Sequence, residues 1–182
     1  ERLGEKYDVY VLDVRGRGLS SSGPELAYDA ETCAQDVNAF AAALSLASYA
    51  LLGHSMGARF ALRAAVLQPA GVRRLVLVDP PVSGPGRRAY PGQWPWYADS
   101  IRQSLPGMSA EQMRAFCPTW SEEQRRLRAE WLHTCYEPAI QRAYDDFHQV
   151  DSHRDYPLLT MPTLLMAAGK GGVIQPEDRA EI

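Results

Sequence analysis

Long hydrophobic runs are missing from this sequence, and so is a large excess of charge of either sign. No apolar stretch reaches the roughly 18 residues that a membrane-spanning helix needs, and no charged-then-apolar leader opens the chain. The 19 basic and 22 acidic residues are dispersed and give a net charge of -3, which argues against nucleic acid or an anionic membrane surface as a partner. We therefore expect a small-molecule partner.

Cysteine is scarce as well. The three cysteines, Cys33, Cys117 and Cys135, have none of the short paired spacings that a zinc site or a redox dithiol requires. Reduced thiols in a cytoplasmic protein are the simplest interpretation, and no metal is expected. The chain starts at Glu1 without a methionine and stops at Ile182 inside an expected helix, so we expect both ends to be cut from a longer protein.

What the sequence does contain is an alternation of strand and helix patterns. With 182 residues and 46% hydrophobic content, it has the size and core of one domain. Apolar runs rich in β-branched and aromatic residues predict strands at 7–14, 49–52, 72–79 and 162–169. Helical periodicity predicts one helix that follows the N-cap Asp29 and reaches Leu44, and another that ends before Pro69. Because strands that alternate with helices pair in parallel, the expected fold class is α/β with a mostly parallel sheet flanked by helices.

The segment 81–160 has a different pattern, because it holds all four tryptophans and consists of helical and loop sequence. Two capping boxes, Ser109 with Gln112 and Ser121 with Gln124, help to predict three or four short helices. We expect a core over 1–80, an inserted helical cap over 81–160 and a return to the core sheet over 161–182.

The pentapeptide Gly53–Gly57 fits the G-x-S-x-G pattern of a nucleophile elbow, and it lies between an expected strand and an expected helix. At such a turn Ser55 is the candidate nucleophile, and the free backbone N–H of Met56 is the candidate oxyanion donor. The alternative is a serine that merely caps the helix that starts near Met56.

A serine nucleophile needs a general base, which is normally a histidine held by a carboxylate. His54 should point to the opposite face of its strand, and the other three histidines fall in the cap, where surface or structural roles are expected: His133, His148 and His153. In this motif class the chain order is nucleophile, acid, histidine, so we expect the base and a second oxyanion donor to lie outside these residues. We expect these 182 residues alone to be inactive.

Three features together resemble the α/β-hydrolase superfamily: the Asp13–Ser20 pattern D-x-R-G-x-G-x-S, the Gly53–Gly57 elbow and the Leu75–Asp79 strand. Within the superfamily the sequence is similar to the N-formylmaleamate deformylases of nicotinate degradation, through three segments: Leu52–Ala61, Val78–Pro91 and Trp131–Ile140. The resemblance implies hydrolysis of an N-formyl amide, releasing formate and maleamate, without a metal or an organic cofactor. An esterase, a lactonase, a carbon-carbon hydrolase and a noncatalytic ligand-binding homologue are the alternatives.

The triad acid has more than one candidate. Many members of the superfamily carry it after the strand that corresponds to 163–169, but the loop here contains no carboxylate before Glu177. Asp79 ends the preceding strand at the edge where α/β sheets place their sites, so we prefer it; it could instead cap the turn at Pro80 and Pro81. The Gln175 position is a further candidate location, and glutamine could not serve there as an acid.

An anionic substrate calls for an arginine, because the guanidinium fork matches a carboxylate. The candidates for this role are Arg15, Arg17, Arg59, Arg87 and Arg88, of which we favour Arg17. Trp94 and Trp96 could form a wall of the pocket, although tryptophan in a small helical cap more often belongs to a core.

Overall fold

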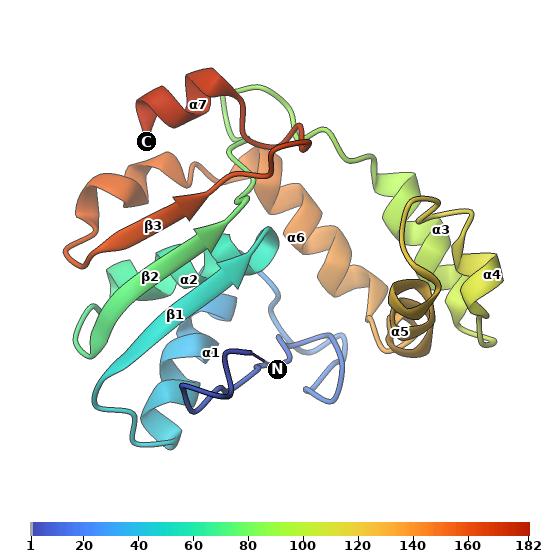
Figure 1. Ribbon diagram of the computed structural model, residues 1–182, viewed down its shortest axis with the longest axis horizontal. Helices are drawn as coiled ribbons and strands as arrows, with labels where there is room; N and C mark the ends of the chain where they lie inside the picture. The colour runs from blue at the N-terminus through green and yellow to red at the C-terminus, as the bar shows by residue number, and fades with distance from the viewer. Residues whose placement is uncertain (1) are drawn as a thin grey trace.

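The structure is a computed structural model that describes residues 2–182, and a parallel sheet of three strands lies at its centre (Figure 1). Strands β1 (Tyr49–His54), β2 (Val72–Val78) and β3 (Thr163–Met166) are neighbours in that order, and both pairs are parallel. The three strands predicted at 49–52, 72–79 and 162–169 are confirmed. Their carboxyl ends all point to one edge of the sheet, and the candidate residues Ser55 and Asp79 lie at that edge.

Two helices of the amino-terminal half form the layer beneath the sheet. Helix α1 (Ala30–Ala43) begins after Asp29, whose carboxylate accepts a hydrogen bond from the Thr32 N–H as the sequence predicts. Helix α2 (Met56–Leu67) is the crossover between β1 and β2. Its buried Leu62 packs in one apolar cluster with Leu75 and Leu77 of β2, because alternate residues of a strand face the same side.

The residues between β2 and β3 form four α-helices and one 3₁₀ helix, where the sequence predicts three or four short helices. They are α3 (Trp94–Ser104), α4 (Ala110–Met113), α5 (Glu122–Leu132), α6 (Glu137–Gln149) and the 3₁₀ helix η1 (His153–Leu158). Both predicted capping boxes are present, at the start of α4 and of α5. Helices α3 to α5 stand apart from the sheet, and α6 leads back toward the strands (Figure 1). The division into residues 1–80, 81–160 and 161–182 stays a prediction. A last helix, α7 (Pro176–Glu181), follows β3.

The strand predicted at residues 7–14 is wrong for this structure. Its backbone forms no ladder with any strand of residues 2–182, and most of its apolar residues are exposed, Val11 to 88%. Tyr10 instead packs edge-on against Phe40 of α1, with ring centroids 6.3 Å apart. The apolar pattern expresses a conformational preference, but a strand also requires a neighbour that accepts and donates its backbone hydrogen bonds.

The helices of residues 2–182 include none that is both long enough and apolar enough to cross a membrane.

Candidate active site

Ser55 stands at the bend between β1 and α2, where the sequence predicts a nucleophile elbow. Its backbone has φ 53° and ψ -120°, a region that L-residues rarely occupy. Although Ser55 holds the N-cap position of α2, its side chain makes no capping hydrogen bond. The hydroxyl is thus not engaged in the capping role of the alternative interpretation, and Ser55 as a residue is partly exposed to solvent.

The first residue of α2, Met56, directly follows Ser55 and presents an unpaired backbone donor. Among residues 2–182, the Met56 N–H has no backbone or side-chain acceptor, as expected for the first residue of a helix. A partial positive charge therefore lies at this helix end, directly after Ser55.

The two glycines of the elbow differ in what they permit. A Cβ at Gly53 would lie 2.3 Å from the Gly57 carbonyl oxygen, so the strand and the helix can pass each other only because Gly53 has no side chain. A Cβ at Gly57 would meet nothing within 4 Å. The close passage of strand and helix therefore requires glycine at position 53 but not at position 57.

Asp79 follows β2 as Ser55 follows β1, because His54 and Val78 are partners in the ladder between the two strands. Asp79 also has a positive φ, 48°. Its N–H donates to the Met166 carbonyl at 2.7 Å, and its Oδ1 accepts from the Ala168 N–H at 3.1 Å. These contacts hold the carboxylate at the loop that follows β3, and no hydrogen bond joins it to the Pro80–Pro81 turn.

Of the four histidines, His54 directly precedes Ser55, and the other three belong to the segment between β2 and β3. His54 is exposed near the end of β1, and His133 is exposed at the end of α5. His148 Nδ1 lies 3.1 Å from the Tyr144 carbonyl, and the side chain of His153, the first residue of η1, is buried. None of the four forms a hydrogen bond with Ser55 or Asp79. Residues 2–182 thus bring a candidate nucleophile and a candidate acid together, and within these residues no histidine is hydrogen-bonded to either.

The alternative acid region has another structural role. Gln175 is the N-cap of α7, and its side chain donates to the Gly172 carbonyl. Asp178 accepts a hydrogen bond from the Gln175 N–H at 2.7 Å and pairs with Arg88. These contacts fit the helix-opening role that the sequence suggests for the acidic residues here.

Four of the five candidate arginines have a carboxylate partner or several carbonyl acceptors within the described chain. Arg15 pairs with Asp36, Arg87 with Glu181, and Arg88 with Asp178. Arg59 donates to three backbone carbonyls, those of Ser83, Phe147 and Val150. Arg17 has no carboxylate partner among residues 2–182; its guanidinium donates to the Arg15 carbonyl at 3.0 Å and contacts the Met56 sulfur at 2.9 Å.

The candidate tryptophans lie in the packing of the helices. The Trp96 indole N–H donates to the Phe116 carbonyl, and its ring packs in the apolar cluster of α3, α4 and α5, with Arg128 stacked over it. Trp94 contacts Tyr144 of α6 at 5.7 Å between ring centroids. Trp96 therefore has a structural role that sequence reasoning already named as the alternative, whereas Trp94 belongs to the aromatic group between α3 and α6.

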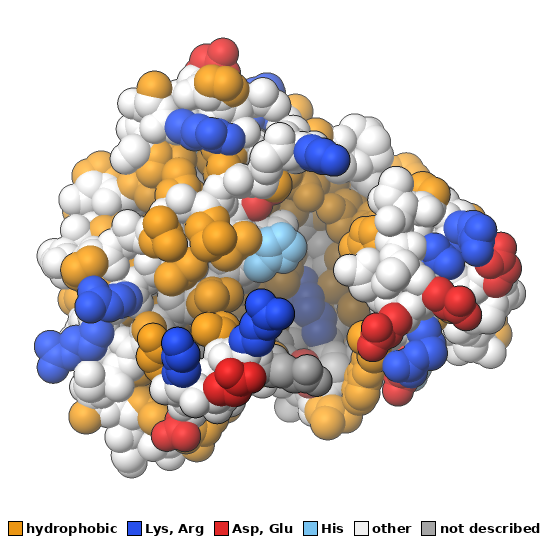
Figure 2. Space-filling view, in the orientation of Figure 1, with side chains coloured by type: hydrophobic (Ala, Val, Ile, Leu, Met, Phe, Trp, Pro, Cys, Tyr) orange, Lys and Arg blue, Asp and Glu red, His pale blue; other side chains and the backbone are white. Residues whose placement is uncertain are grey.

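Figure 2 shows a hollow between the sheet and the group α3 to α5, with a basic side chain on its floor and a histidine and an acidic side chain at its rim. The carboxyl ends of the strands face this hollow (Figure 1). A separate cavity of about 160 Å³ lies among α1, α2, α6 and η1, but its charged side chains are largely engaged, for example Arg63 with Asp155. No group of three His, Cys, Asp or Glu side chains within the described range could hold a metal ion.

The sheet, the crossover helix and the strained serine turn define the class. The chain belongs to the alpha/beta hydrolase fold family, whose model matches residues 1–182. It is 69% identical to an N-formylmaleamate deformylase of Pseudomonas putida over 182 residues, which are 100% of this chain and 68% of that protein.

Solved structures agree with this relationship. The chain superimposes with a TM-score of 0.94 and 53% identity on the crystal structure of an N-formylmaleamic acid deformylase from a Pseudomonas putida strain, covering 99% of this chain and 70% of that one. The crystal structure of an E-2-(acetamidomethylene)succinate hydrolase, at 22% identity and a TM-score of 0.69, shares the fold over 93% of this chain and 66% of its own.

Proposed function

We propose that the full-length protein hydrolyses the formyl amide of N-formylmaleamate and releases maleamate and formate. The observation that carries this proposal is the 69% identity to a deformylase along the whole chain. Ser55 has a strained backbone, and its hydroxyl makes no capping hydrogen bond. This supports a serine mechanism, because it matches the geometry of a nucleophile elbow. We further propose that residues 81–160 act as the cap over this site.

In the proposed reaction, Ser55 Oγ attacks the formyl carbon while a histidine takes the hydroxyl proton. The oxygen of the tetrahedral intermediate acquires negative charge beside the Met56 N–H. When the C–N bond breaks, the histidine gives its proton to the leaving nitrogen and maleamate departs. Water then attacks the formyl ester of Ser55 with the same histidine as base, and formate leaves.

We propose Asp79 as the carboxylate that orients this histidine. It has a fixed position at the strand edge, next to the strand that ends in the serine turn. The chain spans 68% of the length of the Pseudomonas putida relative, so the remaining third can supply the base and the second oxyanion donor. The free thiols Cys33, Cys117 and Cys135 favour a cytoplasmic location as part of the same proposal.

The test is turnover by purified full-length protein, with formate and maleamate quantified by NMR. We expect stoichiometric formate and maleamate, and an inactive Ser55→Ala variant. Full-length protein that leaves N-formylmaleamate intact but cleaves a neutral ester, a lactone or a carbon-carbon bond would assign the fold to one of those other reactions. Protein that cleaves none of them and resists a fluorophosphonate probe would be a binding homologue.

A further inference from the structure

Arg17 lies where the elbow, the Arg15–Gly18 loop and the helical segment meet. Its Nη2 contacts the Met56 sulfur at 2.9 Å, across 39 residues of sequence. The same loop is fastened to the segment that precedes α6, because the Gly18 N–H donates to Thr134 Oγ1 and the Tyr136 N–H donates to the Gly16 carbonyl.

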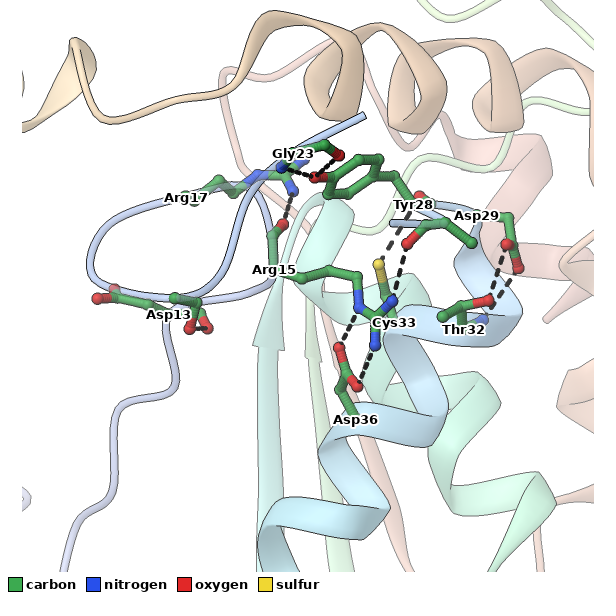
Figure 3. Close-up of polar contacts among 11 residues, drawn as sticks. Asp13, Arg15, Arg17, Gly23, Tyr28, Asp29, Thr32, Cys33 and Asp36 are labelled. Atoms are coloured by element: carbon green, nitrogen blue, oxygen red, sulfur yellow. Dashed lines mark hydrogen bonds and ion pairs between the residues drawn. The ribbon is translucent and has the colours of Figure 1, made fainter. Parts of the chain in front are cut away.

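The two arginines of this loop differ in whether a carboxylate pairs with them (Figure 3). Arg15 directs its fork at both oxygens of Asp36, while Arg17 donates to an uncharged carbonyl. Burial lowers the pKa of the Arg17 guanidinium, and the titratable groups around it are thiols and a phenol: Cys33, Cys135 and Tyr28. Burial also raises the pKa of the Cys33 thiol to about 11, so this thiol does not supply a negative charge at neutral pH.

An unpaired charge in a partly desolvated place is costly unless an anion can pair with it. Arg17 is the one arginine of the five candidates that has neither a carboxylate partner within residues 2–182 nor more than one carbonyl acceptor. It also touches the side chain of Met56, the residue whose own N–H is the proposed oxyanion donor. An anion bound to Arg17 would therefore lie beside the reacting centre.

We propose that Arg17 binds a carboxylate on the leaving-group side of the substrate and makes the site selective for small anionic amides. This proposal rests on the proposed function, since the carboxylate of N-formylmaleamate belongs to the part that leaves as maleamate. Arg17 then holds the substrate while the Ser55–formyl bond forms and the C–N bond breaks. Hydrolysis of the formyl-enzyme involves no carboxylate on the leaving group and does not need Arg17.

The proposal is tested on full-length protein with two donors of the same formyl group, N-formylmaleamate and the neutral ester p-nitrophenyl formate. In Arg17→Met, kcat/KM for the anionic amide is expected to fall by on the order of 10- to 100-fold more than kcat/KM for the ester, mainly through KM. Arg17→Lys keeps the charge without the fork and should recover part of this loss. Arg126→Gln, at an exposed pair with Glu130 on α5, is the matched control and should change neither.

A second measurement separates this inference from the proposed reaction. Maleamate should competitively inhibit ester hydrolysis by the wild type, and Arg17→Met should weaken that inhibition by on the order of 10-fold or more. If N-formylmaleamate is not a substrate but the inhibition still depends on Arg17, the reaction is misassigned and the anion site stands. Equal losses on both donors, or inhibition that is unchanged in Arg17→Met, would overturn the proposal.

Discussion

The Ser55 N–H donates a 2.8 Å hydrogen bond to the carbonyl oxygen of Val78, the residue directly before Asp79. This bond continues the ladder between β1 and β2 by one step, beyond the partners His54 and Val78. Because adjacent strands of a sheet are about 4.8 Å apart, it places the two strained residues side by side. The sheet therefore fixes the relative position of the candidate nucleophile and the candidate acid.

The close approach at the elbow predicts different effects for its two glycines. Gly53→Ala would put a methyl group against backbone atoms of the first turn of α2, and we expect it to destabilise the protein by about 1–3 kcal/mol. Gly57→Ala has open space in a helix and should be neutral or stabilising by up to about 1 kcal/mol. Urea unfolding of both variants measures the difference, and equal stabilities would show that β1 and α2 are not in this contact.

Asp79→Asn tests the assignment of the acid. Asn can still accept the Ala168 hydrogen bond, so we expect the variant to fold, while kcat falls by on the order of 10⁴-fold because the histidine loses its orienting charge. The matched control is Asp178→Asn, which weakens the cap of α7 and the pair with Arg88. It should lower thermal stability but leave kcat within about twofold of the wild type. A change in free energy of about 0.5 kcal/mol, typical of a substitution away from a site, corresponds to about this factor in rate. If the larger kinetic loss appears in Asp178→Asn, the acid lies in the α7 region.

Because the His153 side chain is buried, we predict that the protein loses stability in mild acid. The side chain of His153 is only 8% exposed, and neither ring nitrogen has a hydrogen-bond partner within residues 2–182. Burial lowers the pKa of His153 and Arg87 acts in the same direction; the carboxylates of Asp151, Glu181 and Asp178 oppose them.

The sign follows from linkage. A histidine with a folded pKa below its unfolded value of about 6.5 is neutral in both states at pH 7. As pH falls below 6.5, the unfolded state binds the proton first, and stability is lost until the folded pKa is reached. We expect Tm to drop between pH 7 and pH 5, and to drop less in His153→Phe. The Tm of the His133→Gln variant, changed at an exposed position, should fall with pH as in the wild type. If the Tm of His153→Phe falls in parallel with both, His153 is not the source of the pH dependence.

Local chemistry made much of this structure predictable from sequence. The Asp29 cap, the two capping boxes and the strand-turn-helix around Ser55 each depend on residues a few positions apart, and all are present. The strand predicted at 7–14 failed because pairing is not local: an apolar run does not specify a hydrogen-bonding neighbour.

The site is predictable only in part, for the same reason. The elbow motif locates Ser55. Asp79 is a candidate because it directly follows a strand. The partner of Asp79 in the next loop, Ala168, is 89 residues away, and the contact between Arg17 and Met56 spans 39 residues. The sequence offered five candidate arginines, and the structure distinguishes them by their partners: Arg15, Arg87 and Arg88 pair with carboxylates, and Arg59 donates to backbone carbonyls.

Covalent labelling of Ser55 tests the central claim most directly. Full-length protein is treated with a fluorophosphonate probe, and the modified residue is identified by peptide mass spectrometry, with Ser55→Ala as the control. The account predicts one adduct on the peptide that contains Ser55, loss of activity in step with labelling, and no adduct in the control. An active enzyme that is modified at another residue, or that keeps its activity when Ser55 is replaced by alanine, would contradict it.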